Sequence, residues 1–249
     1  MLYICAVSAP RICCLDLDTF FVSVERLLDP TLIGKPVVVG AAPGHRGVVT
    51  ACSYEVRAFG VRSGMPTAEA MRLAPHAIYL PTRHGTYAPY AARVRDVLTR
   101  HTPIVQTASI DEFYLDFGGC ERLYRAAGDA DDDATIERTL RAICLRIKAE
   151  VGLPASAGIG VSRAIAKIAS GAAKPAGVRL VRSGDERGFL APLPVRKFPG
   201  IGPARACRSI QRAFARALAA LGAPIEPVEI AGADRVTLLG GMIGAIELA

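Results

Sequence analysis

Three acidic residues have the type and the setting that phosphoryl transfer requires. Asp16 lies at the end of an apolar run, and Asp111 and Glu112 are adjacent between two further apolar runs. Phosphoryl transfer commonly uses two divalent ions about 3.5–4 Å apart, and such hard cations bind carboxylate oxygens. We therefore interpret these residues as candidate metal ligands. Acidic residues near strand ends are also common as solvated turn formers, so their spacing alone leaves that interpretation open.

The segment that carries the first of these residues is expected to be a short buried strand at 11–18. Successive residues of a strand point to opposite faces, so Cys14, Asp16 and Asp18 share one side of it. A carboxylate therefore emerges at the end of a core strand. Asp18 is assigned no catalytic role.

A hairpin is expected around the acidic pair. Strand-like runs cover 104–109 and 113–117, which leaves Asp111 and Glu112 at or near the turn between them. Adjacent residues on a regular strand point to opposite faces, so both carboxylates can reach one metal pair only where the chain turns or bulges. The position of the pair in a turn is therefore informative.

The rest of the chain shows the periodicity of helices mixed with short strands. Helical patterns cover 19–28, 54–74, 86–101, 136–151 and 162–173, and strand-like runs cover 36–40, 48–51 and 158–161. Ser162 is expected to cap the helix that follows it, and Pro175 to stop that helix. The segment 128–133 is too acidic to pack and is expected to form a surface loop.

Composition indicates a globular protein with a polyanionic partner. The 249 residues are 51% hydrophobic, which can fill the core of one large domain or of two to three small ones, and the formal net charge is +7. Lys and Arg neutralise phosphates and release condensed counterions. Nucleic acid is therefore the first candidate partner, and an anionic membrane surface is the second.

Cysteine content and apolar runs bear on the compartment. The 7 cysteines are odd in number and include no CxxC pair, which favours a reducing cytoplasm and no zinc site. No signal peptide is expected, because the N-terminus MLYICAVSAP has no basic residue before its apolar run. No stretch reaches the roughly 20 apolar residues that cross a membrane.

Five sequence blocks, in this order and spacing, resemble the Y-family polymerases of the DNA polymerase IV type. They are LDLDTFFVSVE, SYEVRAFGVRSGMP, SIDEFYLD, AGIGVSRAIAKIASGAAKPAG and FPGIGPARA, and they cover roughly residues 11–210. The resemblance implies an α+β fold with a ferredoxin-like palm, an inserted small fingers subdomain and a helical helix-hairpin-helix thumb. The implied boundaries are 1–18 and 84–181 for the palm, 19–83 for the fingers and 182–249 for the thumb.

The resemblance also implies an activity, the addition of dNTPs to a primer on damaged template DNA. Two Mg²⁺ ions would serve the reaction. Asp16, Asp111 and Glu112 would be the catalytic ligands of these ions, and the backbone carbonyl of Leu17 would complete one site.

The nucleotide would be held by side chains from several blocks. Phe21 occupies the position of a steric gate, where a ring under the sugar would clash with a 2′-hydroxyl, and Phe20 is its core-facing neighbour. Tyr54, Arg57 and Lys174 would surround the triphosphate, since guanidinium and ammonium groups suit phosphate oxygens.

Two further details concern the triphosphate. Family members often carry Thr three residues before the tyrosine, whereas this sequence has Ala51 there and Thr50 one residue earlier. Lys167 lies seven residues before Lys174, about two helical turns away and on the same face. It either adds positive potential or is exposed to solvent.

The two Gly-Ile-Gly sequences are interpreted differently. The first, beginning at Gly158, lacks the third glycine of a dinucleotide fingerprint and is expected to be a strand followed by a capped helix. The second, in FPGIGPARA, resembles a helix-hairpin-helix hairpin, whose backbone N–H groups would hold a DNA phosphate. The DNA-binding residues implied there are Gly200, Gly202, Arg205, Arg208 and Arg212. A solvated face or a membrane-surface helix is the ordinary alternative for this basic helix.

The resemblance ends before the end of the sequence. Family members continue with a little-finger domain that grips the duplex and often with a clamp-binding peptide, and we expect both to be absent here. Residues 223–249 match the second half of the thumb poorly. We therefore expect a cytoplasmic monomer with weak, poorly processive binding of primer-template DNA and no membrane association. Whether a sliding clamp is a partner is left undecided by the sequence.

Two other functions remain to be weighed. One is a catalytically weak or silent DNA-binding subunit of a mutagenesis complex, which the absence of a little finger would favour. The joint presence of the three acidic residues and Phe21 argues against it. The other is a different nucleotidyl enzyme with a palm, such as a cyclase, and the gate and hairpin motifs argue against that.

Overall fold

The structure is a computed structural model that describes residues 10–42, 44–193 and 197–199. The strands in these residues are β1 (Ile12–Leu17), β2 (Val37–Gly40), β3 (Val49–Cys52), β4 (Ile78–Pro81), β5 (Val105–Thr107), β6 (Glu112–Asp116), β7 (Ala155–Gly160) and β8 (Val178–Leu180). The helices are α1 (Phe20–Leu28), α2 (Tyr54–Arg57), α3 (Thr67–Leu73), α4 (Ala88–Thr99), α5 (Glu121–Tyr124), α6 (Asp132–Val151), α7 (Arg163–Ala173) and α8 (Glu186–Leu190), and a 3₁₀ turn, η1, covers Pro30–Leu32.

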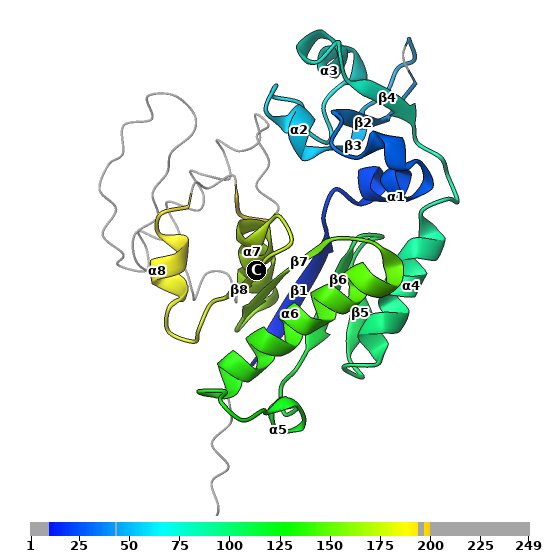
Figure 1. Ribbon diagram of the computed structural model, residues 1–249. Helices are drawn as coiled ribbons and strands as arrows, with labels where there is room; N and C mark the ends of the chain where they lie inside the picture. Colours follow the sequence, from blue (N-terminus) through cyan, green and yellow to red (C-terminus); the bar gives the residue numbers. More distant parts are fainter. Residues whose placement is uncertain (1–9, 43, 194–196, 200–249) are drawn as a thin grey trace, which may run out of the picture.

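The larger sheet has the order β5-β6-β1-β7-β8, with β1 at its centre (Figure 1). Strand β1 runs antiparallel to both β6 and β7. Its residues Cys13, Leu15 and Leu17 belong to an apolar core that also contains side chains of α4 and α6. The alternate residues of β1 face the other side, where α7 packs against β7 and β1. The predicted alternation at 11–18 is therefore confirmed.

Helix α7 lies close to the sheet because one strand residue lacks a side chain. A Cβ atom built on Gly158 of β7 would lie 2.2 Å from the carbonyl oxygen of Ala166 and 2.2 Å from the backbone nitrogen of Ser170. The helix begins where the side chain of Ser162 accepts a hydrogen bond from the N–H of Ile165, as predicted for the cap. This arrangement fixes which α7 side chains lie over β1.

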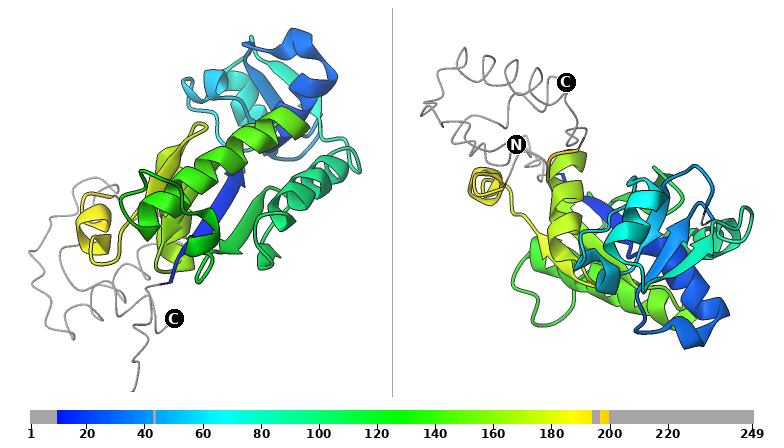
Figure 2. Two further views of the ribbon diagram at one scale, coloured as in Figure 1. Left: turned by 60° about the horizontal axis from the view of Figure 1, so that its bottom comes forward. Right: turned by 90° about the horizontal axis from the view of Figure 1, so that it is seen from above.

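A smaller sheet, of order β3-β2-β4, lies at one end of the larger unit (Figures 1 and 2). One of its faces packs against α2 and α3 through an apolar cluster that includes Val38, Val56 and Ala70. Val22 of α1 and Val39 of β2 belong to a second cluster. The segment between α1 and α4 thus forms an inserted layer with cores of its own, while the boundaries given above for palm, fingers and thumb stay predictions.

The structure corrects the expected helix at 54–74. Two short helices, α2 and α3, replace it, and the chain between them includes Gly60 and Gly64, whose φ angles are +87° and +83°. Residues with a side chain rarely adopt such backbone angles, so the glycines at these positions allow the chain to leave the helix. Strands β4 and β8 and helices α5 and α8 were not predicted.

The acidic segment 128–133 is also packed more closely than expected. Helix α6 begins at Asp132, and the side chain of Asp131 caps it by accepting a hydrogen bond of 2.8 Å from the N–H of Ala134. Asp133 pairs with Arg11 at 2.8 Å. The expected surface loop therefore extends only to Asp131, and the expectation was wrong for Asp132 and Asp133, which begin the helix because carboxylates are favourable at a helix start.

The predicted DNA-binding residues Gly200, Gly202, Arg205, Arg208 and Arg212 lie outside the described residues. Among the residues that are described, no helix is long and apolar enough to cross a membrane.

Candidate active site

Two of the predicted metal ligands lie opposite each other on neighbouring strands. Asp16 of β1 is the register partner of Glu112 of β6, so both carboxylates project from the same face of the sheet. Asp16 is 8% exposed. This face is the one that α7 partly covers, and it carries Cys14 and Tyr114 at the adjoining register position.

Two lysines neutralise this carboxylate pair. The ammonium group of Lys167, on α7, lies 2.9 Å from Asp16 Oδ2 and also bonds Glu112 Oε2. Lys174, directly after α7, bonds Asp16 Oδ1. Lys167 therefore bridges the two carboxylates. The alternative that it is simply exposed to solvent is wrong.

Burial and charge act on these groups in opposite directions. Burial lowers the pKa of Lys167, but the charge of Asp16 and the hydrogen bonds to both carboxylates outweigh it and hold the pKa above the usual value for lysine. Burial, followed by the neighbouring Glu112 carboxylate, raises the pKa of the Cys14 thiol to about 12. Cys14 Sγ lies 3.6 Å from Glu112 Oε1 and donates to it. Lys167, Lys174 and Cys14 each donate to one or both of these carboxylates.

The third acidic residue, Asp111, lies in the turn of the predicted hairpin. Strands β5 and β6 pair on either side of this turn, and the N–H of Leu17 donates to the backbone carbonyl of Asp111 at 2.9 Å. The side chain of Asp111 accepts a hydrogen bond of 2.5 Å from Ser109 Oγ. The turn therefore lies beside the end of β1, although the Asp111 carboxylate bonds within its own loop.

Asp18 lies just past the end of β1 and is 1% exposed. Ser156 Oγ, on β7, donates to its two oxygens at 3.0 and 2.8 Å. The hydroxyl of Tyr54 donates to Oδ1 at 3.3 Å, and the N–H of Ala176 donates to Oδ2 at 2.7 Å. Lys174 Nζ is 3.9 Å from Oδ1. Sequence reasoning assigned this residue no role, although the alternation on β1 had placed it on the same face as Asp16.

Tyr54 and Arg57 come from the inserted layer. The guanidinium carbon of Arg57 lies 4.7 Å from the centroid of the Tyr54 ring, a cation–π distance. Burial and the Asp18 carboxylate raise the pKa of Tyr54, so its hydroxyl remains a donor. Through this contact with Asp18 the structure links the predicted triphosphate residues Tyr54 and Lys174 to the end of β1.

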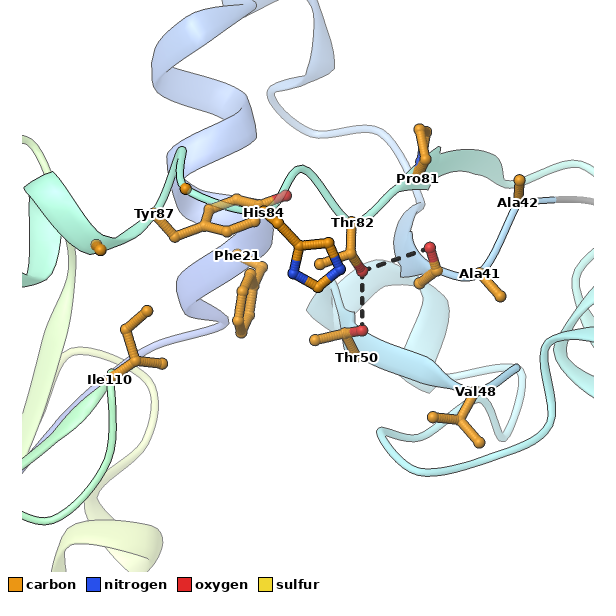
Figure 3. Close-up of a pocket in the computed structure, with 13 residues that line it drawn as sticks. Phe21, Ala41, Ala42, Val48, Thr50, Pro81, Thr82, His84, Tyr87 and Ile110 are labelled. Carbon is orange, nitrogen blue, oxygen red and sulfur yellow. Dashed lines mark hydrogen bonds between the residues drawn. The ribbon is translucent and has the colours of Figure 1, made fainter. Parts of the chain in front are cut away.

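The predicted gate residue Phe21 lines a cavity of about 570 Å³ between the inserted layer and the hairpin turn (Figure 3). Its ring packs edge-on against Tyr87, with the centroids 4.4 Å apart. Figure 3 shows these two rings on one side of the cavity and Ala42 and Val48 on the other. Ile110, the neighbour of Asp111, also lines it. The cavity therefore reaches the turn that carries Asp111.

Other side chains hold the cavity wall in place. Phe20 is buried in the core, as expected for the core-facing neighbour of Phe21. The Tyr87 hydroxyl donates to the buried Glu25 at 2.8 Å, and Arg83 Nε donates to the same carboxylate at 3.0 Å. These contacts were not predicted from the sequence, because Glu25 is far along the chain from Arg83 and Tyr87 and no local pattern relates them.

In the described part of the chain, no three side chains of His, Cys, Asp or Glu converge closely enough to hold one metal ion. The close carboxylate pair is Asp16 and Glu112, and the cations beside it are the ammonium groups of Lys167 and Lys174.

Comparison with known proteins adds relatives to this geometry. The DNA polymerase IV of Streptomyces coelicolor is 45% identical over 197 residues, which are 79% of this chain and 40% of that protein. The DNA polymerase IV of Methanoculleus marisnigri is 43% identical over 190 residues, which are 75% of this chain and 50% of that protein. The chain therefore spans half or less of the length of these relatives.

Solved structures are similar in fold. The crystal structure of DinB from Sulfolobus solfataricus matches with a TM-score of 0.68 and 32% identity, and the match covers 85% of this chain and 57% of that one. An insertion ternary complex of Dbh DNA polymerase matches with a TM-score of 0.69 and 32% identity, covering 85% and 58%. The α+β fold implied by the resemblance is thus confirmed.

Two family patterns also match this sequence. Residues 183–212 match the HHH motif of the IMS family, in agreement with the predicted helix-hairpin-helix. Residues 15–171 match the impB/mucB/samB family over most of the chain. Together with the relatives, these matches confirm the recognition made from the five sequence blocks: the chain belongs to the impB/mucB/samB family of Y-family polymerases.

Proposed function

We propose that this chain is the catalytic part of a translesion DNA polymerase that adds dNTPs to a primer 3′ end. One observation carries the proposal: Asp16 and Glu112 face each other at the end of the central strands, with two lysines against them. Relatives at 45% and 43% identity are named DNA polymerase IV, which supports the same activity.

The donor set at this position fits Mg²⁺. The two carboxylates supply the hard oxygen ligands that Mg²⁺ prefers. The ammonium group of Lys167 bonds both carboxylates, so the position between them already accommodates a positive charge. Asp16, Glu112 and Asp111 would hold the ions, with the carbonyl of Leu17 as a further ligand. Bound there, two Mg²⁺ ions would activate the attacking primer hydroxyl and neutralise the leaving phosphate.

The residues around the carboxylates would bind and orient the nucleotide. Lys174 and Arg57 carry the positive charges that phosphate oxygens require, and Tyr54 offers a hydroxyl beside them. Phe21 would lie under the sugar, because its ring forms a wall of the cavity next to the turn that carries Asp111. Primer-template DNA would be held by the helix-hairpin-helix, with Gly200, Gly202, Arg205, Arg208 and Arg212 at its phosphates.

The test is Mg²⁺-dependent extension of a primed template by the purified chain. Glu112→Gln keeps the size of the side chain and removes its charge, so we expect incorporation to fall by at least a hundredfold, the order of effect seen when charge stabilisation is removed. Asp116→Asn is the matched control, because it lies at the other end of the same strand and caps the N–H of Gly118 at 2.8 Å. This variant is expected to keep its activity.

Loss of incorporation in Glu112→Gln and its retention in Asp116→Asn would support the polymerase assignment. A wild-type chain that binds primer-template DNA and incorporates nothing would contradict it and would favour the silent DNA-binding subunit.

A further inference from the structure

Asp18 is a carboxylate that the proposed chemistry does not use, although it is more deeply buried than Asp16, at 1% against 8% exposure. Removing a carboxylate from water is costly unless hydrogen bonds or charges compensate it. Asp18 receives hydrogen bonds from Ser156, Tyr54 and Ala176, which come from three different parts of the chain. A residue with that many partners ties those parts together.

Two of the three partners lead to predicted nucleotide-binding side chains. Tyr54 is itself one, and its ring carries the guanidinium of Arg57 at 4.7 Å. Ala176 lies two residues after Lys174, whose ammonium group is 3.9 Å from Asp18 Oδ1. The inserted layer and the segment after α7 are thus both attached to Asp18, the residue directly after β1.

Backbone strain at the same place is an independent observation. Within the described residues, two non-glycine residues have positive φ: Thr19 at 45° and Ala176 at 49°. Thr19 directly follows Asp18, and Ala176 donates its N–H to the Asp18 side chain. Such conformations are unfavourable for residues with a side chain and persist only where the surroundings fix them.

The backbone of Asp18 is fixed as well. Its N–H donates to the carbonyl of Pro154 at 2.9 Å, and its own carbonyl accepts from Ser23 Oγ at 2.7 Å. The backbone N–H, the backbone carbonyl and both carboxylate oxygens of Asp18 are therefore all hydrogen-bonded. Of the two residues with positive φ, Thr19 follows Asp18 in the chain and Ala176 donates to its side chain. This network of hydrogen bonds joins the inserted layer, through Tyr54, to β7 of the large sheet, through Ser156.

We propose that Asp18 is a positioning residue that holds Tyr54 and the Lys174–Ala176 segment in register with Asp16, and so sets the affinity for the incoming nucleotide. This inference rests on the proposed function. Asp18 does not touch the reacting atoms; it acts through the groups that donate to it. Its loss should therefore weaken nucleotide binding more than it slows the chemical step.

The test compares wild type with Asp18→Asn and Tyr54→Phe, singly and together. Asn keeps the shape but turns one oxygen into an NH₂ group, which then faces a donor. In single-turnover incorporation we expect Asp18→Asn to raise the dNTP concentration for half-maximal rate about tenfold or more. The maximal rate should change less than threefold, and the affinity for primer-template DNA should not change.

A second readout does not depend on catalysis. Calorimetry of dNTP binding to the complex with a dideoxy-terminated primer should show a loss of affinity by a similar factor. The effect of Tyr54→Phe should be smaller in the Asp18→Asn background than in wild type, because coupled residues are not additive. Ser156→Ala, which removes only the hydroxyl donor, keeps the inference testable if Asp18→Asn fails to fold, and it should shift the same affinity in the same direction.

Unchanged nucleotide affinity in a folded Asp18→Asn or Ser156→Ala protein would overturn the inference, as would full additivity with Tyr54→Phe. A lower melting temperature without a change in nucleotide affinity would mean a purely structural role. If the wild-type chain incorporates no nucleotide, the proposed function fails. The calorimetric comparison of dNTP affinity between wild type and Asp18→Asn then tests the role of Asp18 separately.

Discussion

Asp16 and Glu112 are register partners across the antiparallel pair of β1 and β6. Like charges directly opposite each other destabilise such a pair. Here the ammonium group of Lys167 bonds both carboxylates, and that of Lys174 bonds Asp16. The stability of this part of the sheet therefore depends on a cation, which makes it sensitive to mutation and to added metal.

We expect Lys167→Met to lower the free energy of unfolding by about 1–3 kcal/mol, because it leaves two partly buried carboxylates without their shared donor. Mg²⁺ should raise the melting temperature of this variant more than that of wild type, since the ion can replace the ammonium group. Thermal denaturation in EDTA and in Mg²⁺ measures both effects. Lys35→Met, at an exposed position, is the control. Equal stability of Lys167→Met and wild type in EDTA would contradict the prediction.

Phe21→Ala should relax the choice between deoxyribonucleotides and ribonucleotides. The half-buried ring packs on Tyr87 and forms a wall of the cavity, so truncation opens space where a 2′-hydroxyl would lie. We expect the preference for dNTPs over rNTPs in primer extension to fall by at least about tenfold, or 1.4 kcal/mol. Phe117→Leu should lower the melting temperature and leave the preference unchanged, because Phe117 is buried in the same core and packs against Tyr124 rather than Phe21. An undiminished preference in Phe21→Ala would exclude the gate.

Gly158→Ala should destabilise the protein strongly. The added methyl group would lie 2.2 Å from backbone atoms of α7, so the helix would have to move away from the sheet. Overpacking of this kind typically costs about 1–3 kcal/mol, and it would also displace Lys167 from the carboxylates. Gly171→Ala is the matched control within α7, because nothing lies within 4 Å of its added Cβ and alanine favours a helix by up to about 1 kcal/mol. Chemical denaturation of both variants checks the prediction, and equal midpoints would refute it.

Local patterns predicted the elements that depend on neighbouring residues. The alternation at 11–18 gave β1 the expected faces, and Ser162 caps α7 through a hydrogen bond to a residue only three positions away. The hairpin around Asp111 was predicted for the same reason, since its strands are close in sequence. These features follow from backbone geometry and hydrogen bonds within a few residues.

Local patterns failed where the deciding contact was elsewhere. The expected helix at 54–74 is interrupted near Gly60 and Gly64, and the acidic residues before α6 are stabilised by capping and by Arg11 rather than by solvent. A polar pattern is compatible with a helix, a turn or a capped helix start. Contacts with distant side chains select among them.

The acidic residues, the strand face that carries Asp16 and the family could all be recognised without a structure, because residue types and short spacings are local properties. The bridge that Lys167 forms between Asp16 and Glu112, and the burial of Asp18 among its hydrogen-bond donors, became visible in the folded protein alone. Those contacts depend on the order of strands in the sheet and on how closely α7 packs against it. Strand order and helix packing bring together residues that are far apart along the chain, so no local pattern specifies them.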